Sequence, residues 1–167
     1  CLSNLPKWRK NIDYRKSYSS FKSKGGGVIL DLSHELDYLT WLFGDIKSFS
    51  KNVAKISDLE INSEDYAAII GKTKKNIFFN LTLNYFSQKD MREILIDGHD
   101  FTIYIDLIKS TYIKYTSSKL IKKFFSVKDI NLTYKLQLNS FLGNKHSHLC
   151  SYKEGVSLMN VIDKLKR

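Results

Sequence analysis

Apolar residues recur every three or four positions in three stretches of the chain, and they alternate with polar residues between those stretches. The first pattern predicts amphipathic helices over residues 30–43, 130–142 and 152–166. The buried face expected for the first helix consists of Leu32, Leu36, Leu39, Leu42 and Phe43. The alternating pattern predicts strands over residues 46–56, 66–73, 76–86, 91–96, 101–108, 111–115 and 120–127.

This order of elements, a helix followed by a run of strands and then two helices, predicts an α+β fold. We expect a two-layer sandwich in which one large, mostly antiparallel sheet has helices packed on one face. The 167 residues suit a single domain with a hydrophobic core, and a hydrophobic content of 43% excludes a disordered chain. The face of the sheet that the helices leave open is predicted to form a homo-oligomer interface.

The amino-acid composition limits the kinds of molecule that this chain is expected to bind. The formal charge is +10, yet only four of the 27 basic residues are arginine, which argues against specific nucleic-acid binding and favours an acidic substrate or nucleotide. Two cysteines form no disulfide framework, so a reducing, cytoplasmic setting is expected. No apolar run is long enough to span a bilayer, and we expect no membrane partner. Because the sequence begins with Cys1, we expect a fragment of a longer protein.

Three consecutive glycines that open directly into the first helix are the strongest chemical signal. Glycine permits close backbone approach, and a helix start there offers unpaired N–H groups to an anion. Asp31 and His34 lie three residues apart on one helix face near that start, which places a proton-transfer residue beside it. The alternative for Asp31 is a carboxylate that only favours the helix dipole. Neither GxxxxGK[ST] nor GxGxxG occurs, so the run is no nucleotide fingerprint.

Other polar residues offer weaker candidates. Tyr14, Arg15 and Tyr18 precede the glycines and could bring a cation and two hydroxyl groups to the same pocket; the alternative is a solvated basic loop. His146 and His148 lie in a polar segment near Cys150, but a metal site needs three or four converging ligands, and we expect none.

Residues 25–37 together with Trp41-Leu42-Phe43-Gly44 resemble the signature of the Gfo/Idh/MocA oxidoreductases, at the start of their C-terminal domain. Residues 5–8 and 13–19 are similar to a subgroup associated with surface-sugar biosynthesis. Residues 92–106 and 152–166 resemble a family hairpin and the terminal helix. Many members separate the aspartate and the histidine by four residues where this chain has three, and both spacings keep one helix face.

The resemblance implies that residues 1–167 are the C-terminal substrate-binding and oligomerisation domain of a longer enzyme. Family members bind NAD or NADP through an N-terminal Rossmann domain, absent here, and a sugar or polyol through a C-terminal domain. The resemblance implies that His34 is the active-site histidine and Asp31 its partner, and that a lysine from the absent domain completes the site. We further expect Gly26 and Gly27 to approach the cofactor.

The resemblance also implies a substrate class. We expect a sugar or nucleotide sugar from surface-polysaccharide or glycan biosynthesis, with Tyr14, Arg15, Tyr18 and Asn84 as substrate-binding residues. The fragment alone is predicted to be inactive because it has no site for the hydride carrier. The alternative is a non-catalytic sugar-binding or assembly module of the same fold.

Overall fold

The computed structural model describes residues 1–9, 11–125, 130–143 and 149–167. Its contacts divide the chain into two units, residues 1–90 with 156–167, and residues 91–155. Both helices and strands are present, and the expected α+β class is confirmed. Within the described residues, no helix combines the length and the apolar character that crossing a membrane requires.

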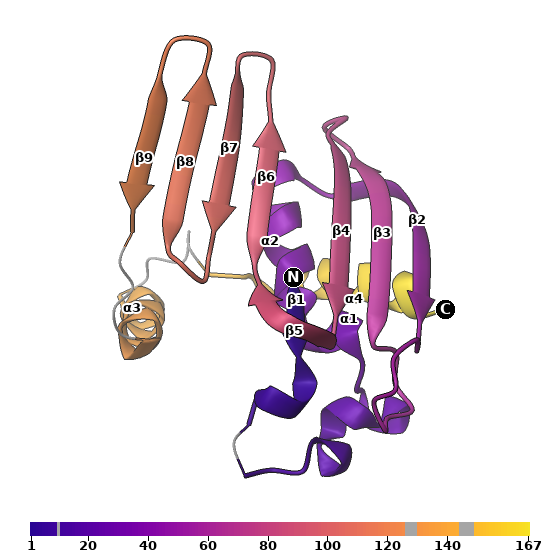
Figure 1. Cartoon of the computed structure of the whole chain (residues 1–167). Helices are drawn as coiled ribbons and strands as arrows, with labels where there is room; N and C mark the ends of the chain where they lie inside the picture. Colours follow the sequence, from indigo (N-terminus) through magenta and orange to yellow (C-terminus); the bar gives the residue numbers. More distant parts are fainter. Residues whose placement is uncertain (10, 126–129, 144–148) are drawn as a thin grey trace. The chain divides into compact units, whose positions relative to one another are not determined.

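The sheet of the first unit has the strand order β2-β3-β4-β1-β5 (Figure 1). Its strands are β1 (Leu2–Asn4), β2 (Ile46–Ala54), β3 (Tyr66–Thr73), β4 (Phe78–Asn84) and β5 (Phe86–Met91). The antiparallel register pairs Ile69 with Lys51 on one side and with Leu81 on the other, while β1 runs parallel to β4. The predicted hairpin of residues 66–86 is therefore confirmed.

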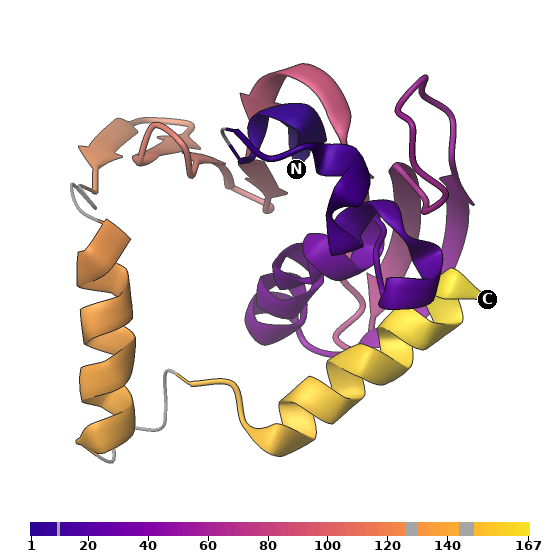
Figure 2. The same cartoon turned by 90° about the horizontal axis from the view of Figure 1, so that it is seen from below.

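Three helices lie on one face of this sheet: α1 (Val28–Asp31), α2 (Ser33–Phe43) and α4 (Tyr152–Lys166). Figure 2 shows α4 running across the sheet on the side where α1 and α2 lie. The strands send alternate apolar side chains into this layer, so helices and strands bury one common core. Its fully buried members include Val28, Ile29, Leu36, Ile69, Leu83, Tyr85, Ile162 and Leu165.

The helix predicted over residues 30–43 begins earlier and is broken. α1 starts at Val28, directly after Gly27, and Leu32 (φ −104°, ψ 24°) separates it from α2. The buried face is Leu32, Leu36 and Leu39, whereas Leu42 is 44% exposed. The expectation of a buried Leu42 is therefore wrong.

Residues 2–9 and 11–24 carry no periodicity and contain β1 and four short 3-10 turns. These are η1 (Leu5–Lys7), η2 (Tyr14–Lys16), η3 (Tyr18–Ser20) and η4 (Lys22–Lys24). Gly25 ends the last turn in the left-handed region at φ 78°, which favours glycine.

The second unit contains a four-stranded antiparallel sheet and one helix. The strands follow chain order as β6 (Glu93–Asp97), β7 (Phe101–Asp106), β8 (Thr111–Thr116) and β9 (Leu120–Phe124), and α3 spans Ile130–Leu142. The strands thus form two hydrogen-bonded sheets where the sequence suggested one. At Arg92, between β5 and β6, the carbonyl accepts the Leu107 N–H (2.9 Å), so pairing with β7 begins a new ladder.

Candidate functional site

His34 stands in the first turn of α2 beside a buried carboxylate. Its Nε2 lies 3.1 Å from Oε1 of Glu35, and the Glu35 side chain is only 1% exposed. Tyr38, one turn later, donates its hydroxyl proton to Oε2 of the same carboxylate. The His34 side chain is 47% exposed. An accessible imidazole against a fixed carboxylate can accept a proton with its counter-ion already in place.

The carboxylate of Asp31, the last residue of α1, is held by a tyrosine that lies between two strands of the sheet. Its Oδ2 accepts a 2.6 Å hydrogen bond from the hydroxyl of Tyr85, which lies between β4 and β5. Tyr85 is fully buried, and the ring of Trp8 meets it edge-on at 5.2 Å. Burial, followed by the hydrogen bond to Asp31, raises the pKa of Tyr85 far above its usual value, so its hydroxyl stays a donor.

Asp31 and His34 therefore occupy neighbouring turns but have different partners. Tyr85 orients Asp31 and Glu35 lies against His34, with the break at Leu32 between them. The imidazole and the Asp31 carboxylate are both fixed independently of one another. An acid/base group and a second carboxylate are thus available at one end of the helical layer.

Internal packing accounts for Gly26 and Gly27. A Cβ on Gly26 would lie 2.4 Å from the carbonyl oxygens of Tyr18 and Ser19, and one on Gly27 (φ 120°) would lie 2.1 Å from Oε1 of Glu64. The Glu64 carboxylate thus occupies the space in front of the helix start. A contact between these glycines and a cofactor stays a prediction.

Tyr14 and Arg15 come together at Glu60. The Glu60 N–H donates to Oη of Tyr14 (3.3 Å), and the Arg15 guanidinium contacts the Glu60 carboxylate at 3.4 Å. Arg15 also binds both oxygens of Asp13, at 2.9 and 3.0 Å, and these bonds lower the pKa of the Asp13 carboxyl. The guanidinium is thus already engaged by two carboxylates in this structure.

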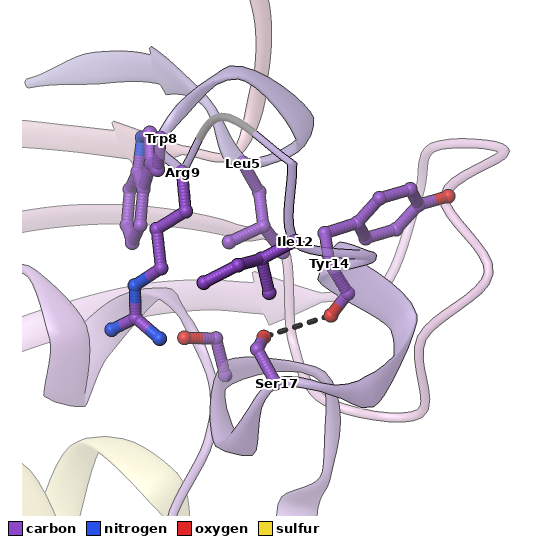
Figure 3. A pocket seen from close by; sticks show the side chains of 7 residues that line it. Leu5, Trp8, Arg9, Ile12, Tyr14 and Ser17 are labelled. Atoms are coloured by element: carbon purple, nitrogen blue, oxygen red, sulfur yellow. Dashed lines mark hydrogen bonds between the residues drawn. The ribbon is translucent and has the colours of Figure 1, made fainter.

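Tyr14 also borders a small hollow under the N-terminal segment (Figure 3). Its carbonyl accepts the hydroxyl proton of Ser17 (2.8 Å), while its ring points away from Trp8 and Arg9. The remaining predicted hydroxyl, that of Tyr18, belongs to a ring that is 48% exposed and has the Arg9 guanidinium 5.7 Å from its centre. Among the residues described, no recorded hydrogen bond or ion pair joins this segment to His34.

Asn84 ends β4 and is buried within the sheet. Its Oδ1 accepts the backbone N–H of Ser87 (3.2 Å), and its carbonyl accepts the hydroxyl of Ser3 (3.3 Å). These contacts connect β4, β1 and β5. They give Asn84 a structural function, and its proposed contact with substrate stays a prediction.

The described side chains were also considered as ligands of a metal ion. No group of three or more His, Cys, Asp or Glu side chains suited to a metal is present in the described part of the chain. His146 and His148 lie outside the described residues.

Sequence reasoning missed three participants: Glu35, Tyr85 and Glu64. Glu35 follows His34 directly, but its burial depends on packing that no local pattern reveals. Tyr85 continues the inward alternation of Phe79, Leu81 and Leu83, which was a usable signal. Glu64 lies in a loop far along the chain from Gly27 and gave no signal.

A family model described as the C-terminal alpha/beta domain of an oxidoreductase family matches residues 7–159. No curated protein sequence matches the chain.

Several solved structures share the fold. UDP-N-acetylglucosamine 3-dehydrogenase GnnA from Acidithiobacillus ferrooxidans is 17% identical, with a TM-score of 0.72 over 98% of this chain and 49% of that one. An oxidoreductase from Agrobacterium radiobacter, in complex with NAD+, L-tartaric acid and magnesium, is 14% identical. Its TM-score is 0.73, and the match covers 96% of this chain and 50% of that one.

The WlbA dehydrogenase from Bordetella pertussis, in complex with NADH and UDP-GlcNAcA, is 16% identical, with a TM-score of 0.58 over 85% of this chain and 45% of that one. The present chain therefore spans about half the length of these relatives, and the likeness concerns the fold.

Proposed function

Because this chain belongs to the Gfo/Idh/MocA oxidoreductase family through its C-terminal alpha/beta domain, we propose that it is the substrate-binding half of an NAD(P)-dependent dehydrogenase. The proposed substrate is a sugar or nucleotide sugar. The observation that carries the proposal is the exposed imidazole of His34 against the buried Glu35 carboxylate, within a domain that the family model matches over residues 7–159. Two of the similar structures are named for a UDP-sugar dehydrogenase or a complex with a UDP-sugar, which supports the substrate class.

The glycine run does not fit the phosphates of a dinucleotide. Glu64 fills the space in front of Gly27, and the Val28 N–H donates to the Glu64 carbonyl (2.9 Å). The Glu64 side chain therefore leaves no room for a phosphate group directly in front of Gly27. We therefore assign the nicotinamide cofactor, which would supply the hydride acceptor, to a Rossmann domain elsewhere in the longer protein.

Within this chain, the proposed chemistry is proton transfer at the substrate hydroxyl. The Nε2–H of His34 faces the Glu35 carboxylate, so the other ring nitrogen, Nδ1, accepts the substrate proton, and the carboxylate stabilises the imidazolium that forms. Tyr85 holds the Asp31 carboxylate ready to accept a hydrogen bond from a neighbouring hydroxyl. The predicted substrate-binding residues Tyr14, Arg15 and Tyr18 would bind the remainder of the substrate.

The test is turnover by the longer protein that contains this chain, assayed with NAD and NADP against a panel of UDP-sugars. His34→Asn is expected to lower kcat by about a hundredfold or more, since general acid–base catalysis contributes on that order. His99→Asn is the matched control, because His99 is 97% exposed in a turn of the second unit.

Full activity of the His34→Asn variant would contradict the acid/base assignment. Absence of cofactor binding and turnover in the wild-type longer protein would favour the non-catalytic sugar-binding or assembly module instead. The isolated 167-residue chain is expected to show no turnover under any of these conditions.

A further inference from the structure

The first unit contains an open cleft of about 480 Å³ that the proposed active site does not use. It lies between the end of β2, the loop of residues 62–64, η4 and the last turn of α4. Among the described residues, its wall carries five basic side chains and one acidic side chain: Lys22, Lys51, Lys55, Lys166 and Arg167, with Glu64. A concave surface with this excess of one charge concentrates ions of the opposite sign.

Two of the lysines balance the negative groups that the wall itself contains. Lys51 Nζ donates to the carbonyl oxygens of Lys164 (2.9 Å) and Leu165 (2.6 Å), where the dipole of α4 ends in partial negative charge. Lys166 Nζ lies 3.0 Å from Oε1 of Glu64 and donates to the Gly26 carbonyl (2.9 Å). The acidic side chain found in the described part of the wall is therefore already paired with a lysine.

The remaining lysines are left to face solvent in the cleft. Across the part of the chain that the structure describes, no carboxylate lies within ion-pair distance of Lys22 or Lys55. Lys22 is fixed at its backbone, because its N–H donates to Oδ1 of Asn62 (2.8 Å) across the cleft wall. Lys55 follows directly after β2 and donates to the carbonyl of Ser57. The two exposed ammonium groups and the net positive wall match a multiply charged anion.

We propose that this cleft binds a phosphate-bearing anion, with Lys22 and Lys55 as its principal ligands. Lysine ammonium groups bind phosphate oxygens as point charges, and the neighbouring amide of Asn62 can donate a further hydrogen bond. The site shares none of its residues with the His34–Glu35–Tyr38 and Asp31–Tyr85 groups. It is a second binding site and stands independently of the proposed dehydrogenase activity.

The experiment titrates the isotope-labelled 167-residue chain with inorganic pyrophosphate and follows its amide signals by NMR. Saturable shifts are expected at residues 22, 55 and 62. In the double variant Lys22→Gln/Lys55→Gln, the pyrophosphate Kd should rise about tenfold or more, because two charge-assisted contacts are lost. The matched control is Lys47→Gln/Lys89→Gln, which removes two exposed lysines outside the cleft and should change the Kd less than about twofold.

Equal weakening in the two double variants would overturn the site, because overall charge would then explain the binding. Shifts that do not saturate, or that spread over exposed lysines throughout the chain, would overturn it as well. His34→Asn should leave the pyrophosphate Kd unchanged, and a loss of affinity in that variant would contradict a separate site. A second titration with UDP in place of pyrophosphate shows which kind of molecule carries the phosphates. Tighter binding of UDP than of pyrophosphate indicates a nucleotide ligand, and equal binding indicates recognition of the phosphates alone.

Discussion

At the scale of single residues, Tyr85 connects the sheet to the helical layer. Its hydroxyl donates to Asp31, its carbonyl accepts the Leu5 N–H (2.8 Å), and its ring meets Trp8. One fully buried side chain thus fixes the N-terminal segment and the candidate carboxylate together. Removing its hydroxyl therefore affects both the stability of the core and the position of Asp31.

Tyr85→Phe is expected to lower the free energy of unfolding by about 1–3 kcal/mol, because the Asp31 side chain loses the hydrogen bond that the buried hydroxyl donates. Urea unfolding of the 167-residue chain measures the loss. Tyr152→Phe is the control, since this tyrosine is 89% exposed and should change stability little. Identical stability of the two variants would show that the Tyr85 hydroxyl adds nothing to folding.

Gly26→Ala tests whether internal packing explains the glycine run. The new methyl group would collide with the carbonyl oxygens of Tyr18 and Ser19, so we expect a loss of about 1–3 kcal/mol in the free energy of unfolding. Gly155→Ala is a control of opposite sign, because nothing lies within 4 Å of the added Cβ and alanine favours the helix by about 0.5–1 kcal/mol. Thermal unfolding of both variants should shift in opposite directions; a stable Gly26→Ala chain would contradict the close approach.

At the scale of elements, the turn between β7 and β8 depends on one carboxylate. Asp106 Oδ1 accepts the N–H groups of Ile108 (3.0 Å) and Lys109 (2.9 Å), and Oδ2 accepts the Lys109 ammonium (2.8 Å). The Lys109 side-chain bond, followed by that to the Lys109 backbone, lowers the pKa of Asp106. A carboxylate with a lowered native pKa stabilises the folded state above its unfolded pKa, and this contribution disappears as pH falls through the native value.

Asp106→Asn is therefore expected to destabilise the second unit at neutral pH and progressively less below about pH 4, because the carboxyl of the unfolded chain takes up its proton there and that of the folded chain only at lower pH. Urea unfolding across this pH range, followed at amides of residues 93–116 by NMR, measures the difference. Asp90→Asn, at an exposed position in β5, serves as the control. A difference in stability that stays constant over the range would contradict an ionised Asp106 in the turn.

At the scale of the whole molecule, the proposed homo-oligomer would use the open face of the first sheet. On this face Ile70 pairs with Asn80 and Lys72 pairs with Phe78, so the two exposed apolar side chains lie diagonally on neighbouring strands. Ile70 is 62% and Phe78 is 77% exposed. Apolar groups left open on a sheet face are typical of protein–protein interfaces.

Ile70→Lys/Phe78→Lys is expected to shift the chain toward the monomer in sedimentation experiments, because it places charge in the proposed contact. Leu120→Lys/Phe124→Lys, which changes exposed apolar residues of β9 in the second unit, tests whether the effect belongs to this face. An unchanged oligomeric state in the first variant and dissociation in the second would move the interface to the other sheet. A wild-type chain that stays monomeric at high concentration would refute self-association of this chain.

Much of the fold could be predicted from the periodicity. The strand over residues 66–73 and the helices over 130–142 and 152–166 are confirmed with their predicted bounds. The break at Leu32 and the division into two sheets could not be predicted, because both depend on contacts between distant segments. The glycine signal located the beginning of the helix that carries the candidate site, and there Asp31 and His34 remain the proposed catalytic residues.

The sequence alone determined which residue types occur together near the start of α1 and α2, because neighbours along a helix stay neighbours in space. Only the tertiary structure decided their partners. Tyr85 reaches Asp31 from 54 residues away, and Lys166 reaches the Gly26 carbonyl from 140 residues away. Periodicity reports which face of an element is buried, but hydrogen bonds and ion pairs between elements depend on how the elements are packed. For this reason the candidate residues could be identified from the sequence, whereas their electrostatic surroundings and the basic cleft could not.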